Sequence, residues 1–274
     1  MDEMNLLGMQ RAEFQHAKIV NRRSKWMQIF IVVISIASVF MTDRLFVYTL
    51  VLINLVLALL WLYFSTQAKK SHNIAERARR ALVLFKGLGI ALGRKSFADL
   101  KMSVKSSEDE WEKYKDANYF KAEGQYGYKM LTEMLEESCF WSKHLFKKCA
   151  TRYWYYFIAV LALSVIGLLA VPLLNPAGSG LLISQAFCLV LIWLISGNLF
   201  ADAYNFSSTA SLLDSIEERL SSMVDKEEDN QDVLSVFCDY NALVGGAPTI
   251  PLGLYEKYRD KLNKLWDEQK QGLV

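Results

Sequence analysis

The sequence has few of the residues on which most enzyme active sites depend. Only three histidines occur among its 274 residues, and His16, His72 and His144 are widely separated. The motifs of zinc peptidases, P-loop nucleotidases and serine hydrolases are absent, and no pair of metal ligands has a usual spacing. We therefore expect no catalytic residue, no metal site and no enzymatic activity.

Charged residues are missing from four long blocks, at 26–41, 45–64, 153–174 and 181–201. A helix needs about 20 apolar residues to cross a hydrocarbon core of about 30 Å, so the last three blocks are long enough and the first is slightly short. Buried hairpins of a soluble helical protein are the alternative, but soluble helices need a polar face. The sequence therefore predicts an all-α membrane protein with four transmembrane helices in two hairpins.

Charge in the flanking segments predicts the orientation. Residues 1–25 carry five Lys and Arg against three acids, and the tip at 42–44 carries one of each. Residues 65–152 carry eighteen Lys and Arg against eleven acids, whereas the tip at 175–180 is uncharged. Because cytoplasmic segments of membrane proteins are enriched in Lys and Arg, we expect both termini and the long middle segment to be cytoplasmic.

Cysteine is scarce as well, and its placement excludes a disulfide framework. The four cysteines are Cys139, Cys149, Cys188 and Cys238, without any CxxC spacing. Cys188 lies within an uncharged block, and the other three lie in segments that we assign to the cytoplasm. Cytosolic thiols stay reduced, so we expect four structural thiols.

The cytosolic segments are predicted to be helical. The chain divides into an N-terminal cytosolic segment (1–25), a first hairpin (26–64), a basic cytosolic segment (65–152), a second hairpin (153–201) and an acidic cytosolic segment (202–274). The basic segment has a net charge of +7, and the acidic segment, with seven Lys and Arg against fourteen acids, has −7. We expect these two segments to pack against each other or against other copies.

Local sequence signals indicate several helix boundaries. Gly87, Gly89 and Gly93 are expected to end the helix that continues from the second block. A helix that starts near Tyr128 is expected to run into the third block, because apolar residues recur there at helical spacing. No stretch alternates with a period of two over a useful length, so we predict no sheet.

The stretch 245–266 contains two of the four prolines. Pro248 and Pro251 favour extended backbone at the residue before each of them, and Pro251 is expected near the first turn of a terminal helix. The apolar residues Leu254, Tyr258, Leu262 and Leu265 recur at helical spacing beyond it. We therefore expect a docking helix with a rigid entry.

Polar residues in and after the uncharged blocks are candidates for the lining of a pore. They are Asn54 in the second block and Gln185, Ser196, Asn198 and Asp202 along the fourth block and just after it. Polar groups in hydrocarbon usually face protein or a water-filled cavity, and interhelical hydrogen bonding is the alternative for each of them. No ion filter or chain of intramembrane carboxylates is present, which favours a passive pore over a pump.

A resemblance to a known family rests on the two separated hairpins and three stretches of sequence. The stretches are ANYF at 117–120, MLTEMLEESCFWSKHLFKK at 130–148 and APTIPLGLYEKYRDKLNKLW at 247–266. Together they resemble the SMODS-associating four-transmembrane effector family, pore-forming proteins of bacterial anti-phage operons. The family tail follows the pattern A-P-x-I-P-x-x-x-Y and then a charged helix that ends in Trp. The matching residues here are Ala247, Pro248, Ile250, Pro251, Tyr255 and Trp266.

This resemblance implies a membrane effector of a cyclic-oligonucleotide-based antiphage signalling system. From the resemblance we expect a neighbouring nucleotidyltransferase to make a cyclic nucleotide after infection, and the effector then to permeabilise the bacterial inner membrane and cause abortive infection. We expect a homo-oligomer in the lipid bilayer, no cofactor apart from a cyclic oligonucleotide ligand, and no DNA or RNA partner. The alternative is a non-conducting scaffold or adaptor that binds a protein partner through its cytosolic helices.

If the cyclic nucleotide binds directly, the basic segment is the expected place. The candidates are Arg77, Arg79, Arg80, Arg94 and Lys95 for the phosphates and Tyr126, Tyr128 or Tyr240 for stacking on the bases. For the three arginines near the second block, membrane anchoring and attraction to anionic headgroups are the alternatives. No appended nucleotide-binding domain is evident, so the helical cytosolic part or a partner must detect the signal.

Overall fold

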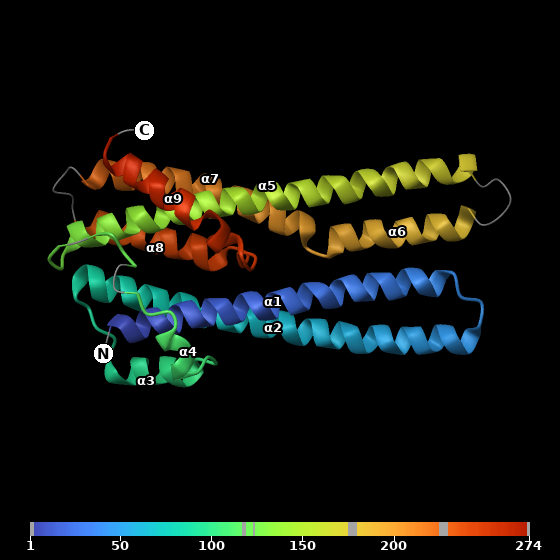
Figure 1. Cartoon of the computed structure of the whole chain (residues 1–274), viewed down its shortest axis with the longest axis horizontal. Helices are drawn as coiled ribbons and strands as arrows, with labels where there is room; N and C mark the ends of the chain where they lie inside the picture. The colour runs from blue at the N-terminus through green and yellow to red at the C-terminus, as the bar shows by residue number, and fades with distance from the viewer. Residues whose placement is uncertain (1–2, 117–118, 123, 175–179, 225–229, 273–274) are drawn as a thin grey trace. The chain divides into compact units, whose positions relative to one another are not determined.

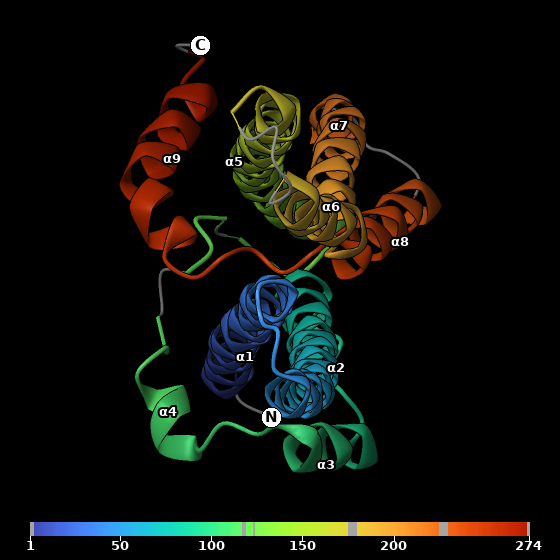
Figure 2. The ribbon, with the colours of Figure 1, turned by 90° about the vertical axis from the view of Figure 1, so that its right-hand side faces the viewer.

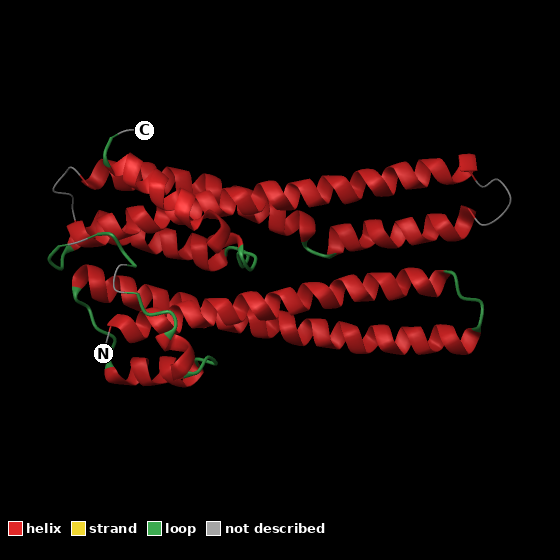
Figure 3. Ribbon diagram, in the orientation of Figure 1, coloured by secondary structure: helices red, strands yellow, loops and turns green. Residues whose placement is uncertain are grey.

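The computed structural model describes residues 3–116, 119–122, 124–174, 180–224 and 230–272, and every regular element in these ranges is a helix (Figures 1 and 3). The helices are α1 (Glu3–Val39), α2 (Arg44–Leu88), α3 (Arg94–Ser103), α4 (Glu108–Glu112), α5 (Tyr128–Leu174), α6 (Gly180–Ser196), α7 (Leu199–Val224), α8 (Asn230–Gly246) and α9 (Leu254–Lys270). The predicted all-helical class is therefore confirmed for the described residues. Residues 175–179 of the uncharged tip lie outside them.

Three stretches of helix are long and apolar enough to cross a membrane: Arg44–Leu88, Tyr128–Ala170 and Leu182–Met223. The first uncharged block belongs to α1, which ends at Val39. The uncharged part of α1, at 26–39, therefore spans about 21 Å at 1.5 Å per residue, which is less than a hydrocarbon core. By length and composition, three helices could therefore cross a membrane, and the fourth span stays a prediction.

The last of these stretches is interrupted, which differs from the single helix expected over 181–201. α6 ends at Ser196 and α7 begins at Leu199. Asn198 has a φ of 64°, in the left-handed region that asparagine tolerates better than most residues. Its carbonyl then accepts the backbone N–H of Asp202 at 2.7 Å, inside the first turn of α7. The Gly197–Asn198 joint therefore separates two helical directions.

The chain forms two compact units, which are described separately. The amphipathic unit comprises Met1–Ile19, Gln67–Lys148 and Phe206–Val274, and the apolar unit comprises Val20–Thr66 and Cys149–Asn205. α1, α2, α5 and α7 each contribute residues to both units.

The core of the amphipathic unit joins segments that are distant in sequence. Gly87 of α2 lies directly against Leu131 of α5, because a Cβ on this glycine would be 3.1 Å from the leucine Cα. α2 ends at Leu88 and Gly89 has a φ of 71°, as the glycine signals predicted. α5 begins at Tyr128, also as predicted.

Ion pairs connect the basic segment with the acidic segment, as their opposite net charges predicted. Lys121 pairs with Asp267 at 2.5 Å, and Lys143 pairs with Asp214 at 2.9 Å. These contacts place α7 and α9 against the stretch that leads into and forms α5. The packing of the two segments therefore occurs within one chain.

A buried glutamate of α1 holds the connection between α3 and α4. The Glu13 side chain is fully buried, and its Oε1 accepts the backbone N–H groups of Lys105 at 2.6 Å and Ser106 at 2.7 Å. The Ser106 hydroxyl in turn accepts the indole N–H of Trp111 at 3.0 Å. Gly8 allows this approach, since a Cβ there would be 2.8 Å from the Trp111 carbonyl oxygen.

In the apolar unit, α1 lies beside α2 and α5 lies beside α6 (Figures 1 and 2). Asp43 caps α2 because its Oδ1 accepts the backbone N–H of Leu45 at 2.9 Å. α5 and α6 approach each other closely at Gly167, where a Cβ would be only 2.1 Å from the Phe187 ring. Only glycine leaves room for that ring.

We expect the substitution Gly167→Leu to destabilise the α5–α6 pair by at least about 1–3 kcal/mol, because the added side chain must displace the Phe187 ring. Thermal unfolding of the purified chain in dodecyl maltoside, followed by intrinsic fluorescence, measures the effect. Ala162→Leu is the matched control, since Ala162 is exposed on the same helix. An unfolding temperature for Gly167→Leu equal to that of the control would contradict the packing.

Candidate functional site

Two of the predicted ligand-binding residues meet in the interior of the amphipathic unit. The Arg79 guanidinium of α2 lies 4.9 Å from the ring centroid of Tyr240, which belongs to α8. Arg79 Nε and Nη2 donate to Glu76 Oε2 at 2.9 and 2.7 Å, and Nη2 also donates to Asn241 Oδ1 at 2.8 Å. Arg79 is 8 % exposed and Tyr240 is 1 % exposed. Neither side chain is accessible to a ligand in this conformation.

The Tyr240 hydroxyl extends this buried network to α5. It lies 3.0 Å from the Ser142 hydroxyl and donates to the Ser138 carbonyl at 3.2 Å. Burial raises the pKa of Tyr240 to about 12, against the opposing effect of the nearby Arg79 charge, so the phenol stays neutral. The network therefore joins α2, α5 and α8 instead of presenting Arg79 and Tyr240 to a phosphate and a base.

The other basic candidates are exposed. Arg77 and Arg80 lie on the outer side of α2, and the Arg80 Nε donates to the Glu76 carbonyl at 3.3 Å. Arg94 and Lys95 open α3 and are also exposed. Tyr126 is 67 % exposed, whereas Tyr128 is half-buried. The exposed side chains are available to a ligand, and the basic ones belong to two different helices, α2 and α3.

The predicted pore-lining residues have different environments in the apolar unit. Asn54 donates its side-chain N–H to the Ser35 hydroxyl at 3.1 Å, which is an interhelical bond between α2 and α1. Asp202 pairs with Lys25 at 2.9 Å, and Asn198 forms the exposed joint before α7. Gln185 is exposed on α6. Ser196 ends α6, and its side chain lies outside the described residues.

The tail motif packs on α5. Trp266 is 3 % exposed and its ring centroid lies 5.1 Å from that of Phe140, while Tyr255 contacts Trp141 at 5.5 Å between centroids. Ile250 packs against the same cluster, and Ala247 is buried. Pro248 lies in the segment without helix that leads from α8 to α9.

Pro251 lies outside the terminal helix, which differs from its expected place near the first turn. α9 begins at Leu254 and its N-cap is Gly253, with a φ of 82°. The Pro251 carbonyl accepts the backbone N–H of Leu254 at 3.2 Å, which makes a turn before the helix. The docking of α9 through Leu254, Leu262 and Trp266 agrees with the predicted apolar stripe.

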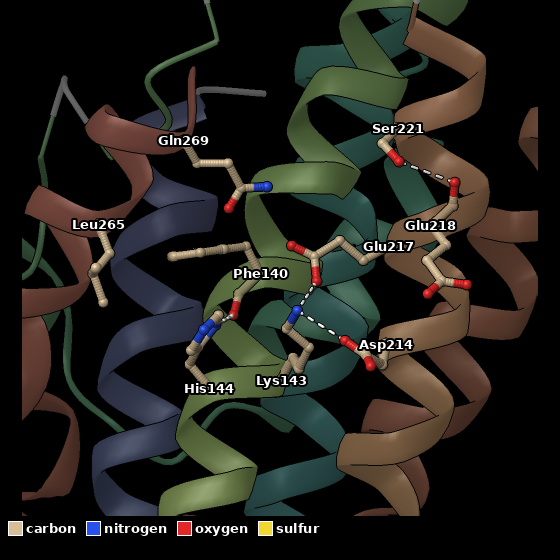
Figure 4. Close-up of a pocket in the computed structure, with 9 residues that line it drawn as sticks. All are labelled: Phe140, Lys143, His144, Asp214, Glu217, Glu218, Ser221, Leu265 and Gln269. Carbon is tan, nitrogen blue, oxygen red and sulfur yellow. Dashed lines mark hydrogen bonds and ion pairs between the residues drawn. The ribbon is translucent and has the colours of Figure 1, made fainter. Parts of the chain in front are cut away.

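A cleft of about 340 Å³ opens between α5, α7 and α9 of the amphipathic unit (Figure 4). Its lining residues are Phe140, Lys143, His144, Asp214, Glu217, Glu218, Ser221, Leu265 and Gln269. Lys143 lies at its centre and forms ion pairs with Glu217 and, at 2.9 Å, with Asp214. Lys143 therefore neutralises part of the negative charge that α7 contributes.

The charges in the cleft are fixed by these contacts. Partial burial acts to lower the pKa of Lys143, but its hydrogen bonds to Glu217 and Asp214 prevail and the pKa is raised. The Lys143 hydrogen bond lowers the pKa of Asp214. Burial lowers the pKa of His144, whose Nδ1 lies 2.8 Å from the Phe140 carbonyl. A carbonyl only accepts, so Nδ1 carries the proton and neutral His144 donates through it.

The cleft contains groups that can recognise a ligand but no assembled catalytic pair. A lysine held as an ammonium ion is a poor nucleophile. The Ser221 hydroxyl donates to the Glu218 carbonyl at 3.0 Å, and Figure 4 shows Ser221 and His144 at opposite ends of the cleft. These side chains therefore suit binding and packing better than bond cleavage.

Sequence reasoning missed this cleft and the network around Arg79. Asp214, Glu217 and Ser221 recur at three and four residues on α7, which indicates one polar face of a helix but no partner. Glu76 precedes Arg79 by three residues, a spacing that predicts the ion pair. Nothing local predicts that the pair is buried, because burial depends on the later packing of α8.

Comparison of the chain with protein-family models, with curated proteins and with solved structures gives no match.

Proposed function

We propose that the chain is a multi-pass protein of the bacterial inner membrane, with both termini cytoplasmic, that forms an oligomeric pore after a signal reaches its amphipathic unit. The observation that carries the proposal is the continuity of α2 and α5. Leu52 of α2 is 63 % exposed and Leu163 of α5 is 68 % exposed, whereas Leu82 and Leu135 on the same helices are 1 % and 0 % exposed. Each helix is therefore one unbroken connection between an apolar exposed stretch and a packed core.

The exposed apolar surface supports assembly in a bilayer. Between 0 % and 12 % of the residues in the apolar parts of the three candidate spans are buried within the chain. Lipid or further copies of the chain must cover such a surface, because soluble proteins rarely expose so large an apolar area. A bundle of four helices fills its own interior with side chains, so a water-filled lumen requires several copies.

A polar side chain on the outer surface of α6 supports a pore over a closed bundle. Gln185 is exposed within an apolar helix, and an amide in contact with lipid is unfavourable. In an oligomer Gln185 can face water in the lumen or a partner chain. We therefore place Gln185 first among the pore-lining candidates, while Asn54 and Asp202 have partners inside the chain.

The trigger that we propose is a cyclic oligonucleotide made by a neighbouring nucleotidyltransferase during phage infection. The tail residues Ala247, Pro248, Ile250, Pro251, Tyr255 and Trp266 support it through the family resemblance. The exposed side chains of Arg77, Arg80, Arg94 and Lys95 support direct binding of the ligand phosphates. Binding at Arg79 or Tyr240 requires the buried network to open first.

Dye release from liposomes that contain the purified chain tests the pore. We expect release only after addition of one member of a panel of cyclic di- and trinucleotides. Constitutive release indicates a pore that another component restrains in the cell. Absence of release under every ligand contradicts a directly gated pore and favours the scaffold, in which the cytosolic helices bind a protein partner.

We expect the substitution Gln185→Leu to abolish dye release while the oligomer persists, because it removes the polar group assigned to the lumen. Release from liposomes and the oligomeric state after chemical cross-linking are measured together. Ile192→Leu is the matched control, since Ile192 is 62 % exposed on the same helix and stays apolar. Unchanged dye release by the Gln185→Leu variant would show that Gln185 does not line the lumen.

A further inference from the structure

Two lysines from different helices converge on one tyrosine of the tail helix. Lys148 Nζ of α5 lies 5.8 Å from the ring centroid of Tyr258, and Lys257 Nζ of α9 lies 5.6 Å from it. Within the described ranges neither ammonium group forms an ion pair with a carboxylate. These three residues form a basic surface, which we name the lysine–tyrosine patch.

The patch lies close to the start of an apolar stretch along α5. Only four residues separate Lys148 from Tyr153, where the third uncharged block begins, and α5 is unbroken over this distance. At 1.5 Å per residue, Lys148 is about 8 Å along the axis from the uncharged block. Headgroups occupy a layer of this thickness beside the hydrocarbon core. Arg152 lies between these two residues and is exposed.

The packing of α9 holds the second lysine in this position. Leu262 and Trp266 of α9 are buried against Phe140 and Leu145 of α5. This hydrophobic contact places the start of α9, which carries Lys257 and Tyr258, against α5. Lys257 also lies in the first turn of α9, where the helix dipole disfavours a cation, so a bound anion would offset this unfavourable interaction.

We propose that the lysine–tyrosine patch binds the phosphate of an anionic phospholipid headgroup and so fastens the tail helix to the bilayer surface. This inference rests on the membrane location in the proposed function and does not depend on conduction. The charge of the patch and its distance from the uncharged block favour a headgroup over a soluble anion. Lys261, exposed one turn further along α9, adds a third positive charge on the same face.

The test measures lipid retention by the full chain in nanodiscs that contain equal amounts of phosphatidylglycerol and phosphatidylcholine with the same acyl chains. Native mass spectrometry gives the ratio of the two lipids that stay bound. We expect Lys148→Gln and Lys257→Gln each to lower this ratio about 5-fold, since a juxtamembrane lysine contributes about that factor. The double variant is expected to lower it about 25-fold, and Lys148→Arg to keep it.

Lys129→Gln is the matched control, because Lys129 is exposed in the first turn of α5, far from the uncharged block. An unchanged ratio in the double variant overturns the proposal. Loss of the preference on addition of inorganic phosphate or of a cyclic dinucleotide also overturns it, in favour of a soluble anion. If the lipid preference is absent while ligand-dependent dye release persists, only this inference fails; failure of the chain to enter nanodiscs contradicts the membrane location itself.

Discussion

Replacement of Arg79 by alanine is expected to lower the free energy of unfolding of the amphipathic unit by about 3–5 kcal/mol, because it leaves a buried charge on Glu76 without its partner. Glu76 is 3 % exposed and has no access to water that could compensate for the loss. The Asn241 side chain loses its donor as well. Thermal unfolding in dodecyl maltoside, followed by circular dichroism, measures the effect.

Two further variants separate the ion pair from side-chain volume. Arg77→Ala removes an exposed arginine from the same helix and is expected to change the stability by no more than about 0.5 kcal/mol. The double variant Glu76→Leu/Arg79→Met removes both charges and keeps most of the volume, so we expect it to lose less stability than Arg79→Ala, with the lost hydrogen bond to Asn241 as the main remaining cost. If Arg79→Ala is as stable as Arg77→Ala, the buried network does not form.

Replacement of Trp266 by alanine is expected to destabilise the docking of α9 by about 3–5 kcal/mol, since the indole is buried against Phe140 and leaves a large cavity. The remaining contacts of the helix include Leu254, Leu262 and the ion pairs of Asp267 with Lys121 and of Lys270 with Glu136. Loss of the contact exposes the α9 backbone, so hydrogen exchange and tryptic cleavage within 254–270 are expected to accelerate.

Lys264→Ala is the control for this experiment, because Lys264 is exposed on α9 and its ion pair, with Glu268 at 3.7 Å, lies within the same helix. Its expected effect is below about 1 kcal/mol, as for most exposed ion pairs. If α9 of the Trp266→Ala variant exchanges as slowly as that of the control, the docking does not depend on the indole. Such a result would also count against the proposed lipid binding at the lysine–tyrosine patch, because the packing of α9 on α5 forms that patch.

Helix type and several boundaries were predictable from the sequence because their causes are local. Gly89, with its positive φ, follows the end of α2, and the 3.6-residue period continues without a breaker from Tyr128 into the third uncharged block. The apolar stripe of α9 is visible in the same way. These features depend on residues a few positions apart, which a single sequence contains.

The candidate site was less predictable because its parts come from distant segments. In the sequence, Arg79 is one of several basic residues. The structure shows that α8 places Tyr240 and Asn241 beside it. The joint at Asn198 was also missed, because asparagine tolerates both the helical and the left-handed backbone. Gln185 stays a candidate for the pore lining, and Arg77 and Arg80 stay candidates for ligand binding, only because their side chains are exposed. Their roles depend on a ligand or on further copies of the chain.

The Gly197–Asn198 joint distinguishes the two helices of the second hairpin, α5 and α6, in how freely each can bend. α5 continues for 47 residues without interruption, so no joint divides it between Tyr128 and Leu174. At the joint, in contrast, the two backbone torsions of Asn198 can absorb a rotation of α7 before it reaches α6. The two helices of the second hairpin therefore differ in bending freedom: α5 has no joint, whereas α6 can change its angle to α7 at one residue.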